Sequence, residues 1–227
     1  STVRAPADLP DQFELVHVNL DDTRGVDPAG LRNLAGAPGL VSLHAAGTDW
    51  FGDEAAVALA DALAADGRSF VKLAVGGTAL SNRGLRGLAR LARLRELMWM
   101  GGTLTADDSG VASLGGLKDL TRLWLIGADR VTGDGVRSLA GCKELTNLAF
   151  SRARLGAEGV AAVAAQFPRM RELSLVECRV SDADLAPLDR LPALEVVNLA
   201  GTDVGSDGMT RLAACPSLKA VFLTGTK

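Results

Sequence analysis

Few residues in this chain have the types and spacing that metal or catalytic chemistry requires. The sequence holds two histidines, His17 and His44, and Asn19 and Asp21 lie close to the first of them. Two imidazoles and a carboxylate could bind a metal ion, but no further strong ligand stands at the usual spacing. We therefore predict ordinary surface residues at these positions, with no metal, no cofactor and no catalytic residue.

Two other patterns resemble binding motifs. Gly133 and Gly135 open an expected helix, but Ser138 stands where a dinucleotide-binding loop has its third glycine, so we interpret the glycines as structural. An arginine stripe on another expected helix could favour nucleic acid. It consists of Arg83, Arg86, Arg90 and Arg93. Because the net charge is −3 and no aromatic residues interleave, we expect a solvated outer face and no nucleic-acid partner.

A repeated apolar phrase, Leu-x-x-Leu-x-Leu, indicates which elements position these side chains. It starts nine times, at Leu15, Leu40, Phe70, Leu94, Leu120, Leu145, Met170, Leu194 and Leu218. Alternating apolar residues predict a short strand with one buried face. A Ser or Thr then precedes Asp or Glu in the next turn, which is typical of a helix start. Each repeat is therefore predicted to be a strand, a turn and a short helix.

This pattern resembles the leucine-rich repeat family over residues 15 to 226. The segment Leu139–Leu145 is similar to the cysteine-containing subclass, and Gly156–Ala161 to the ribonuclease-inhibitor-like subclass. The resemblance implies an α/β solenoid, a right-handed horseshoe with about nine parallel strands on the concave face and short helices on the convex face. It also implies a recognition surface in place of a closed pocket.

One position of the family pattern departs from its usual Asn or Cys. It holds Thr23, Thr48, Thr78, Cys178, Thr202 and Thr226, but Ala128 and Ala153 in the middle of the array. Thr can satisfy part of the buried backbone that Asn would bond, and Ala cannot. We expect backbone groups or water to supply the bonds at the two alanines.

The predicted domain organisation is a polar lead-in or cap over residues 1–14 followed by one repeat domain over residues 15–227. The second repeat is longer, with an Ala-rich helix expected over Ala55–Ala65. Lys227 follows the ninth strand directly. This favours a fragment of a longer protein or a covered last strand, and the alternative is a short edge strand that tolerates exposure.

The three cysteines, Cys142, Cys178 and Cys215, favour a structural interpretation. Cys142 and Cys215 occupy equivalent positions three repeats apart, so strand spacing alone separates them by more than ~10 Å. They cannot form a disulfide with each other, and buried thiols are expected. Reduced thiols, with no signal sequence and no membrane-spanning run, favour a cytoplasmic protein without a membrane partner.

The candidate binding site lies in the middle of the predicted concave face. Met98, Met100, Trp124 and Ile126 are expected to be exposed together, and Glu96, Arg122, Asn147 and Ser174 complete the site. An exposed apolar patch with a polar rim marks a binding surface. The alternative is a one-residue slip, which would turn Met98 and Met100 inward and Trp99 outward.

These observations predict a non-catalytic protein–protein interaction module that binds a protein or an extended peptide. Its floor would be about 40 Å long, too open for a metabolite. The alternatives are the substrate-recognition arm of an F-box-like ubiquitin ligase or of a secreted bacterial effector, and an enzyme domain, which no catalytic motif supports. The partner's identity and the oligomeric state are not predicted.

Overall fold

The chain forms a row of parallel strands backed by one layer of helices. The computed structural model describes residues 14–64 and 70–227. Nine strands form one sheet in the order β1-β2-β3-β5-β7-β8-β9-β10-β11. Their bounds are β1 His17–Asn19, β2 Ser42–Ala45, β3 Lys72–Val75, β5 Glu96–Trp99, β7 Arg122–Leu125, β8 Asn147–Ser151, β9 Glu172–Val176, β10 Val196–Asn198 and β11 Ala220–Phe222. Neighbouring strands in the sheet come from successive repeats, as in a solenoid.

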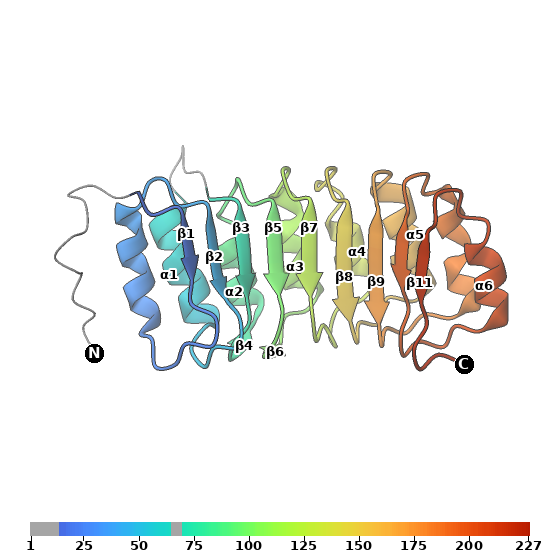
Figure 1. Cartoon of the computed structure of the whole chain (residues 1–227), viewed down its shortest axis with the longest axis horizontal. Coiled ribbons are helices and arrows are strands. Elements are labelled where there is room, and N and C mark those ends of the chain that lie inside the picture. The colour runs from blue at the N-terminus through green and yellow to red at the C-terminus, as the bar shows by residue number, and fades with distance from the viewer. Residues whose placement is uncertain (1–13, 65–69) are drawn as a thin grey trace.

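The helices lie side by side behind the sheet, so that one sheet face stays open (Figure 1). The α-helices are α1 Asp53–Leu63, α2 Asn82–Leu88, α3 Asp108–Ser113, α4 Gly133–Ser138, α5 Gly156–Gln166 and α6 Ser206–Leu212. Three convex segments are 3-10 helices: η1 Pro28–Gly36, η2 Leu114–Gly116 and η3 Asp182–Arg190. A two-stranded sheet of β4 Ala79–Leu80 and β6 Thr103–Leu104 links two turns. The predicted α/β solenoid is confirmed.

The strand register is the predicted one. Met98 pairs with Ala74 and Trp124, while Trp99 pairs with Val75 and Leu125. Trp99 is 0% exposed and belongs to the core with the inward leucines. The one-residue slip is therefore excluded, and the residues expected on the open face project from it.

One of the two alanine turns receives a side-chain contact from the next repeat. Thr23 and Thr202 donate their hydroxyls to backbone carbonyls of their own turns, at 2.6 Å in each case. Ala128 is fully buried, and its N–H donates to the Ser151 carbonyl at 2.8 Å, a bond that Thr48 also makes, to the Gly76 carbonyl. The Ser151 hydroxyl accepts from the N–H of Gly127, at 2.8 Å. At the Ala128 turn the next repeat therefore supplies one additional side-chain hydrogen bond.

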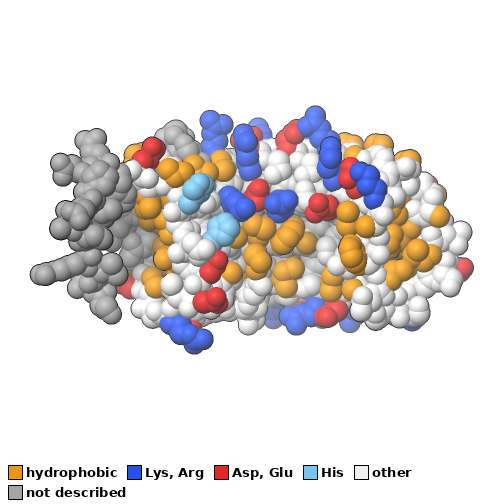
Figure 2. Space-filling model, viewed as in Figure 1, with side chains coloured by type: hydrophobic (Ala, Val, Ile, Leu, Met, Phe, Trp, Pro, Cys, Tyr) orange, Lys and Arg blue, Asp and Glu red, His pale blue; other side chains and the backbone are white. Residues whose placement is uncertain are grey.

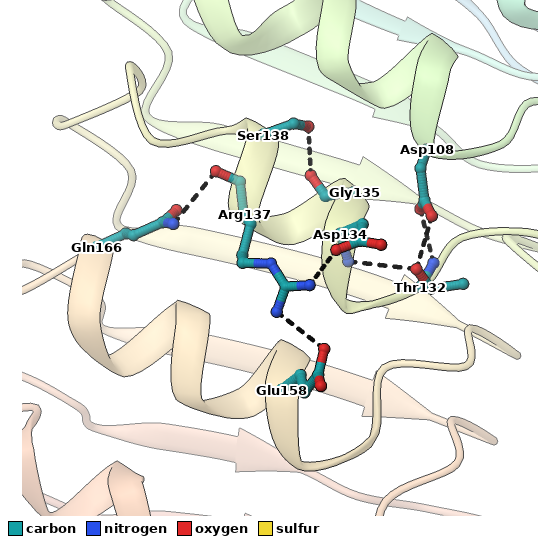
Figure 3. A network of polar contacts seen from close by, with 8 residues as sticks. All are labelled: Asp108, Thr132, Asp134, Gly135, Arg137, Ser138, Glu158 and Gln166. Atoms are coloured by element: carbon teal, nitrogen blue, oxygen red, sulfur yellow. Dashed lines mark hydrogen bonds and ion pairs between the residues drawn. The ribbon is translucent and has the colours of Figure 1, made fainter.

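A second polar ladder joins the helix starts, and the sequence analysis did not predict it. The carboxylate of Asp53 accepts from the backbone N–H of Ser81, and that of Asp108 accepts from the N–H and hydroxyl of Thr132, all within 2.8 Å. Figure 3 shows the Asp108–Thr132 contact reaching from α3 to α4. Each bond satisfies a helix-start group of one repeat with a side chain of the repeat before it.

Gly133 occupies the ladder position of its own repeat. A Cβ on Gly133 would lie 2.8 Å from the backbone nitrogen of Gly159, and one on Gly135 would lie 2.5 Å from the Asp108 carboxylate. Close packing between repeats therefore explains both glycines. Their structural interpretation is confirmed.

Two details of the predicted helices are wrong. The long second-repeat helix runs Asp53–Leu63 instead of Ala55–Ala65, and residues 65–69 lie outside the described part of the chain. The three-residue spacing of Met209 and Leu212 predicts that both face the core, but Met209 is 41% exposed. Gly208 and Leu212, four residues apart, face the core. Met209 directly follows Gly208, so its side chain is rotated about 100° away from the core-facing side of the helix. Of the predicted lead-in, residues 1–13 lie outside the described residues, and the boundary at residue 15 stays a prediction.

Candidate functional site

The open sheet face is the surface that the strand side chains form on the side opposite the helices. This is the predicted concave face. Figure 2 looks onto it and shows histidine and charged side chains over its N-terminal half, with hydrophobic side chains across its middle and C-terminal half. The face therefore has two chemically different parts that meet near β5 and β7.

A charged row occupies the meeting point. The Glu96 carboxylate lies 3.5 Å from the Lys72 ammonium and 3.1 Å from the Arg122 guanidinium. The Arg122 guanidinium also stands over the Trp124 ring, 5.7 Å from its centre. A cation over an indole is attracted to the ring face. The row therefore orients Trp124 as well as separating the two halves.

The predicted apolar patch is only partly exposed. Met100 is 48% exposed, and Trp124 and Ile126 are half-buried on the same face. Met98 was expected to be exposed with them, but it is 7% exposed. Trp124 pairs with Met98 in the neighbouring strand, about 4.8 Å away, and we attribute the burial of Met98 to this large side chain beside it.

The polar residues of the predicted site also differ in their exposure. Glu96, Arg122 and Ser174 are half-buried on the open face. Asn147 was expected at the surface, but it is 8% exposed, and its side-chain oxygen accepts from the Thr146 hydroxyl at 2.7 Å. It therefore contributes to the floor of the face and not to an accessible contact.

The sequence analysis missed an apolar hollow in the C-terminal half. Its volume is about 290 Å³. Its lining is Trp124, Ile126, Leu148, Ala149, Glu172, Leu173, Ser174, Val196, Asn198 and Phe222. Phe222 is 52% exposed at the last strand. Val196 and Phe222 stand in the same strand register as the predicted patch, and that register was the signal available.

A wider groove of about 710 Å³ lies over the N-terminal half. Its polar and charged lining is His17, Asn19, Ser42, His44, Lys72, Arg95, Glu96 and Thr121. The groove runs along the beginnings of β1, β2, β3 and β5. Of this polar and charged lining, Glu96 alone belonged to the predicted site.

Within the groove, His17 Nδ1 lies 2.8 Å from the Ser42 hydroxyl. A serine beside a histidine is part of many nucleophilic sites, but Ser42 is buried, and among the described residues no carboxylate bonds to His17 to orient it. In residues 14–64 and 70–227 no cluster of three His, Cys, Asp or Glu side chains could hold a metal ion. The groove therefore offers hydrogen bonds and charge and not an assembled catalytic centre.

The three cysteines are buried and unpaired in disulfides. Burial raises the pKa of the Cys142 thiol to about 11 and that of the Cys178 thiol to about 12. Burial, with a smaller contribution from Asp189, also raises the pKa of Cys215. Neutral buried thiols are poor nucleophiles, and the structural interpretation is confirmed.

The family follows from the repeat and from one comparison. The family model described as "FBD-associated F-box protein At5g56370, LRR repeats" matches residues 109–227, slightly more than half of the chain. The chain belongs to the leucine-rich repeat family. No curated protein matches it.

The solved structures confirm the fold of this leucine-rich repeat protein. The crystal structure of an internalin C2 from Listeria monocytogenes superposes with a TM-score of 0.65. The superposition covers 86% of this chain and 74% of the internalin chain, with 21% sequence identity. At that identity the likeness concerns the fold alone. In the described part of the chain, no helix is long and apolar enough to cross a membrane.

Proposed function

We propose that this protein is a non-catalytic interaction module that binds a protein or an extended peptide on its open sheet face. The observation that carries the proposal is the adjacency of the exposed Met100 and the half-buried Trp124 and Ile126 in two neighbouring repeats, beside the Glu96–Arg122 ion pair. Apolar side chains with a polar rim are what an exposed binding patch presents, and Trp and Arg are frequent hot spots.

The shape of the face supports a macromolecular partner. The nine strands form a floor that the helices leave open on one side (Figure 1), and the groove and the hollow both lie along it. Metabolite sites usually bury most of their ligand in a deep pocket. Repeat arrays of this family offer extended surfaces, and that is the use we propose here.

The first test is affinity capture from the source organism with immobilised wild type, Met100→Ala and Trp124→Ala. We expect at least one protein to be retained by wild type and lost with both variants, because a hot-spot truncation costs about 2 kcal/mol or more, roughly thirtyfold in affinity. Thermal melts followed by circular dichroism should stay near wild type.

Met209→Ala is the matched control, because Met209 is a comparably exposed methionine on the helix face. It should retain the partner. If every retained protein binds Met100→Ala and Met209→Ala equally, the open face is not the binding site. If Trp124→Ala unfolds the chain, Trp124 belongs to the core, and the proposal then depends on Met100 alone.

The family-model match favours a second candidate, the substrate-recognition arm of a ubiquitin ligase. The matched description names an F-box protein, and the match covers residues 109–227. The decisive observation is the full gene: an F-box-like segment encoded in frame with this chain, and co-purification with ligase subunits, would support it. A full gene without an F-box-like segment, together with no co-purification of ligase subunits, would exclude this candidate.

A further inference from the structure

We propose that the open sheet face recognises an extended protein segment that carries acidic side chains at one end and an apolar anchor at the other. This inference rests on the proposed function and specifies the chemistry of the partner. It follows from the different linings of the N-terminal groove and the C-terminal hollow.

The groove carries a local positive charge on a chain whose net charge is −3. Its charged lining consists of two cations, Lys72 and Arg95, and one carboxylate, Glu96. Glu96 already binds both Lys72 and Arg122. Arg95 is exposed, and within the described residues no carboxylate lies at ion-pair distance from it. The groove therefore complements an anionic partner, and it can offer one or more cations that are not fully neutralised.

The neutral polar lining of the groove is compatible with the same partner. His17, Asn19 and His44 each carry a group that can donate a hydrogen bond, and carboxylates only accept. Asp21 lies on the exposed face beyond β1, but its carboxylate accepts from the N–H of Ala46 at 2.7 Å. The Asp21 carboxylate is thus partly occupied within the protein.

The hollow complements an apolar side chain. Its only charged lining residue is Glu172, and the rest of the lining is largely Trp, Ile, Leu, Val, Ala and Phe side chains. At about 290 Å³ it lies at the lower limit of small-ligand pockets, which start near ~300 Å³. This size suits one or two side chains of a partner better than a whole metabolite. The exposed Phe222 ring forms its outer wall.

The separation of the two parts fixes the spacing in the partner. Arg95 immediately precedes β5, and Ser174 in β9 lies near the middle of the hollow, three strands further along the sheet. Three to four strand steps of about 4.8 Å amount to roughly 14–19 Å, which about five residues of extended chain span. The partner segment therefore crosses the strands, with its acidic end over β3 and β5.

The experiment measures fluorescence anisotropy with synthetic peptides. Each contains a block of glutamates and a Phe-Leu pair joined by a Gly-Ser spacer of one, about five or about twelve residues, and each block alone is also tested. Arg95→Glu tests the groove and Phe222→Ala tests the hollow. The controls are Arg86→Glu and Met209→Ala, since both residues are exposed on the helix face.

We expect the peptide with the middle spacer to bind at least tenfold more tightly than either block alone, because the second contact becomes intramolecular. Arg95→Glu should weaken the binding of this peptide at least fivefold and reduce the salt dependence of its affinity. Phe222→Ala should weaken the binding without changing the salt dependence. The two control variants should bind the peptide as wild type does. Equal binding of all peptides, no measurable binding, or insensitivity to Arg95→Glu would overturn the inference.

The peptide experiment and the capture experiment can fail independently of each other. A captured partner that depends on Trp124 but binds Arg95→Glu normally would leave the interaction module standing and would refute the acidic segment. Peptide binding that survives both Met100→Ala and Trp124→Ala would place the contact elsewhere and would count against the proposed function.

Discussion

At the residue scale, the open face is shaped by a few large side chains among many small ones. Trp124 and Met100 project from the sheet, while Ala74 and Ala149 in the flanking strands are almost fully buried. Small residues beside large ones leave depressions, and the Arg122 guanidinium stands over the Trp124 ring. Such a contact favours one ring orientation before a partner binds, which lowers the entropy cost of binding.

The cysteines give a prediction at the same scale. The thiols of Cys142 and Cys178 are buried, and burial raises their pKa to about 11 and about 12. At pH 8 we expect no reaction of the native protein with Ellman's reagent, and reaction of all three thiols after denaturation. Rapid reaction of a native thiol would show that its repeat opens locally.

The same pKa values predict alkaline destabilisation. Between the ordinary thiol pKa of 9.0 and the raised values, the folded state keeps protons that the unfolded state loses. The thiol contribution to the free energy of unfolding is therefore complete below about pH 9 and declines as the pH rises toward 11 and 12. Urea titrations at several pH values check this, and Cys142→Ala should show a shallower decline than wild type.

At the element scale, each repeat is a unit that its neighbours complete. The helix start of one repeat receives its hydrogen bonds from the side chain that opens the preceding helix, at Asp53, Asn82, Asp108 and Asp182. On the outer surface, Arg137 of α4 reaches Glu158 of α5 at 2.9 Å (Figure 3). The first kind of contact is partly buried and, at the three aspartates, charge-assisted. The second is exposed, so we expect the first to matter more for stability.

Asp108→Ala tests this ranking. The substitution leaves the N–H and hydroxyl of Thr132 without their carboxylate, at 2.7 and 2.6 Å in the native protein. We expect a loss of about 2 kcal/mol in the free energy of unfolding by urea denaturation, the usual range for a bond to a charged group. Asp134→Ala is the control, because it removes an exposed aspartate of the next helix, and it should cost less than about 1 kcal/mol. Equal losses would contradict the ranking.

At the scale of the whole molecule, stability is distributed along a line. Among the described residues, each strand of the nine-stranded sheet pairs only with the strands before and after it, and β11 pairs on one side alone. Leu218, Val221 and Leu223 pack against the core but are only partly buried, whereas the corresponding residues of β7 and β8 are fully buried. Nearest-neighbour arrays with such ends lose protection from the ends inward.

Hydrogen exchange followed by mass spectrometry tests this gradient. We expect the slowest exchange in β7 and β8 and the fastest among the strands in β11, with intermediate rates in β9 and β10. A uniform rate across all nine strands would show that the array opens as one cooperative unit, and the linear description would then be wrong.

The sequence by itself determined the architecture, because the repeat recurs nine times and each copy has the same spacing of apolar residues. Leucines spaced two and three apart fix which strand face is buried, so the register and the inward position of Trp99 could be predicted from one repeat alone. The buried cysteines and the structural role of Gly133 and Gly135 follow from the same regularity.

The tertiary structure decided how accessible each outward-facing side chain is and what surrounds it. Met98 and Asn147 face outward in register, yet both are covered, because their exposure depends on the size of side chains that stand one strand away and about 25 residues away in sequence. The hollow beside Phe222 and the cationic groove at Arg95 likewise arise from five and four adjacent strands respectively. The periodicity within a repeat fixes the side of the strand on which each side chain projects. The exposure of that side chain and the local charge around it depend on residues of neighbouring strands, which only the assembled sheet brings together.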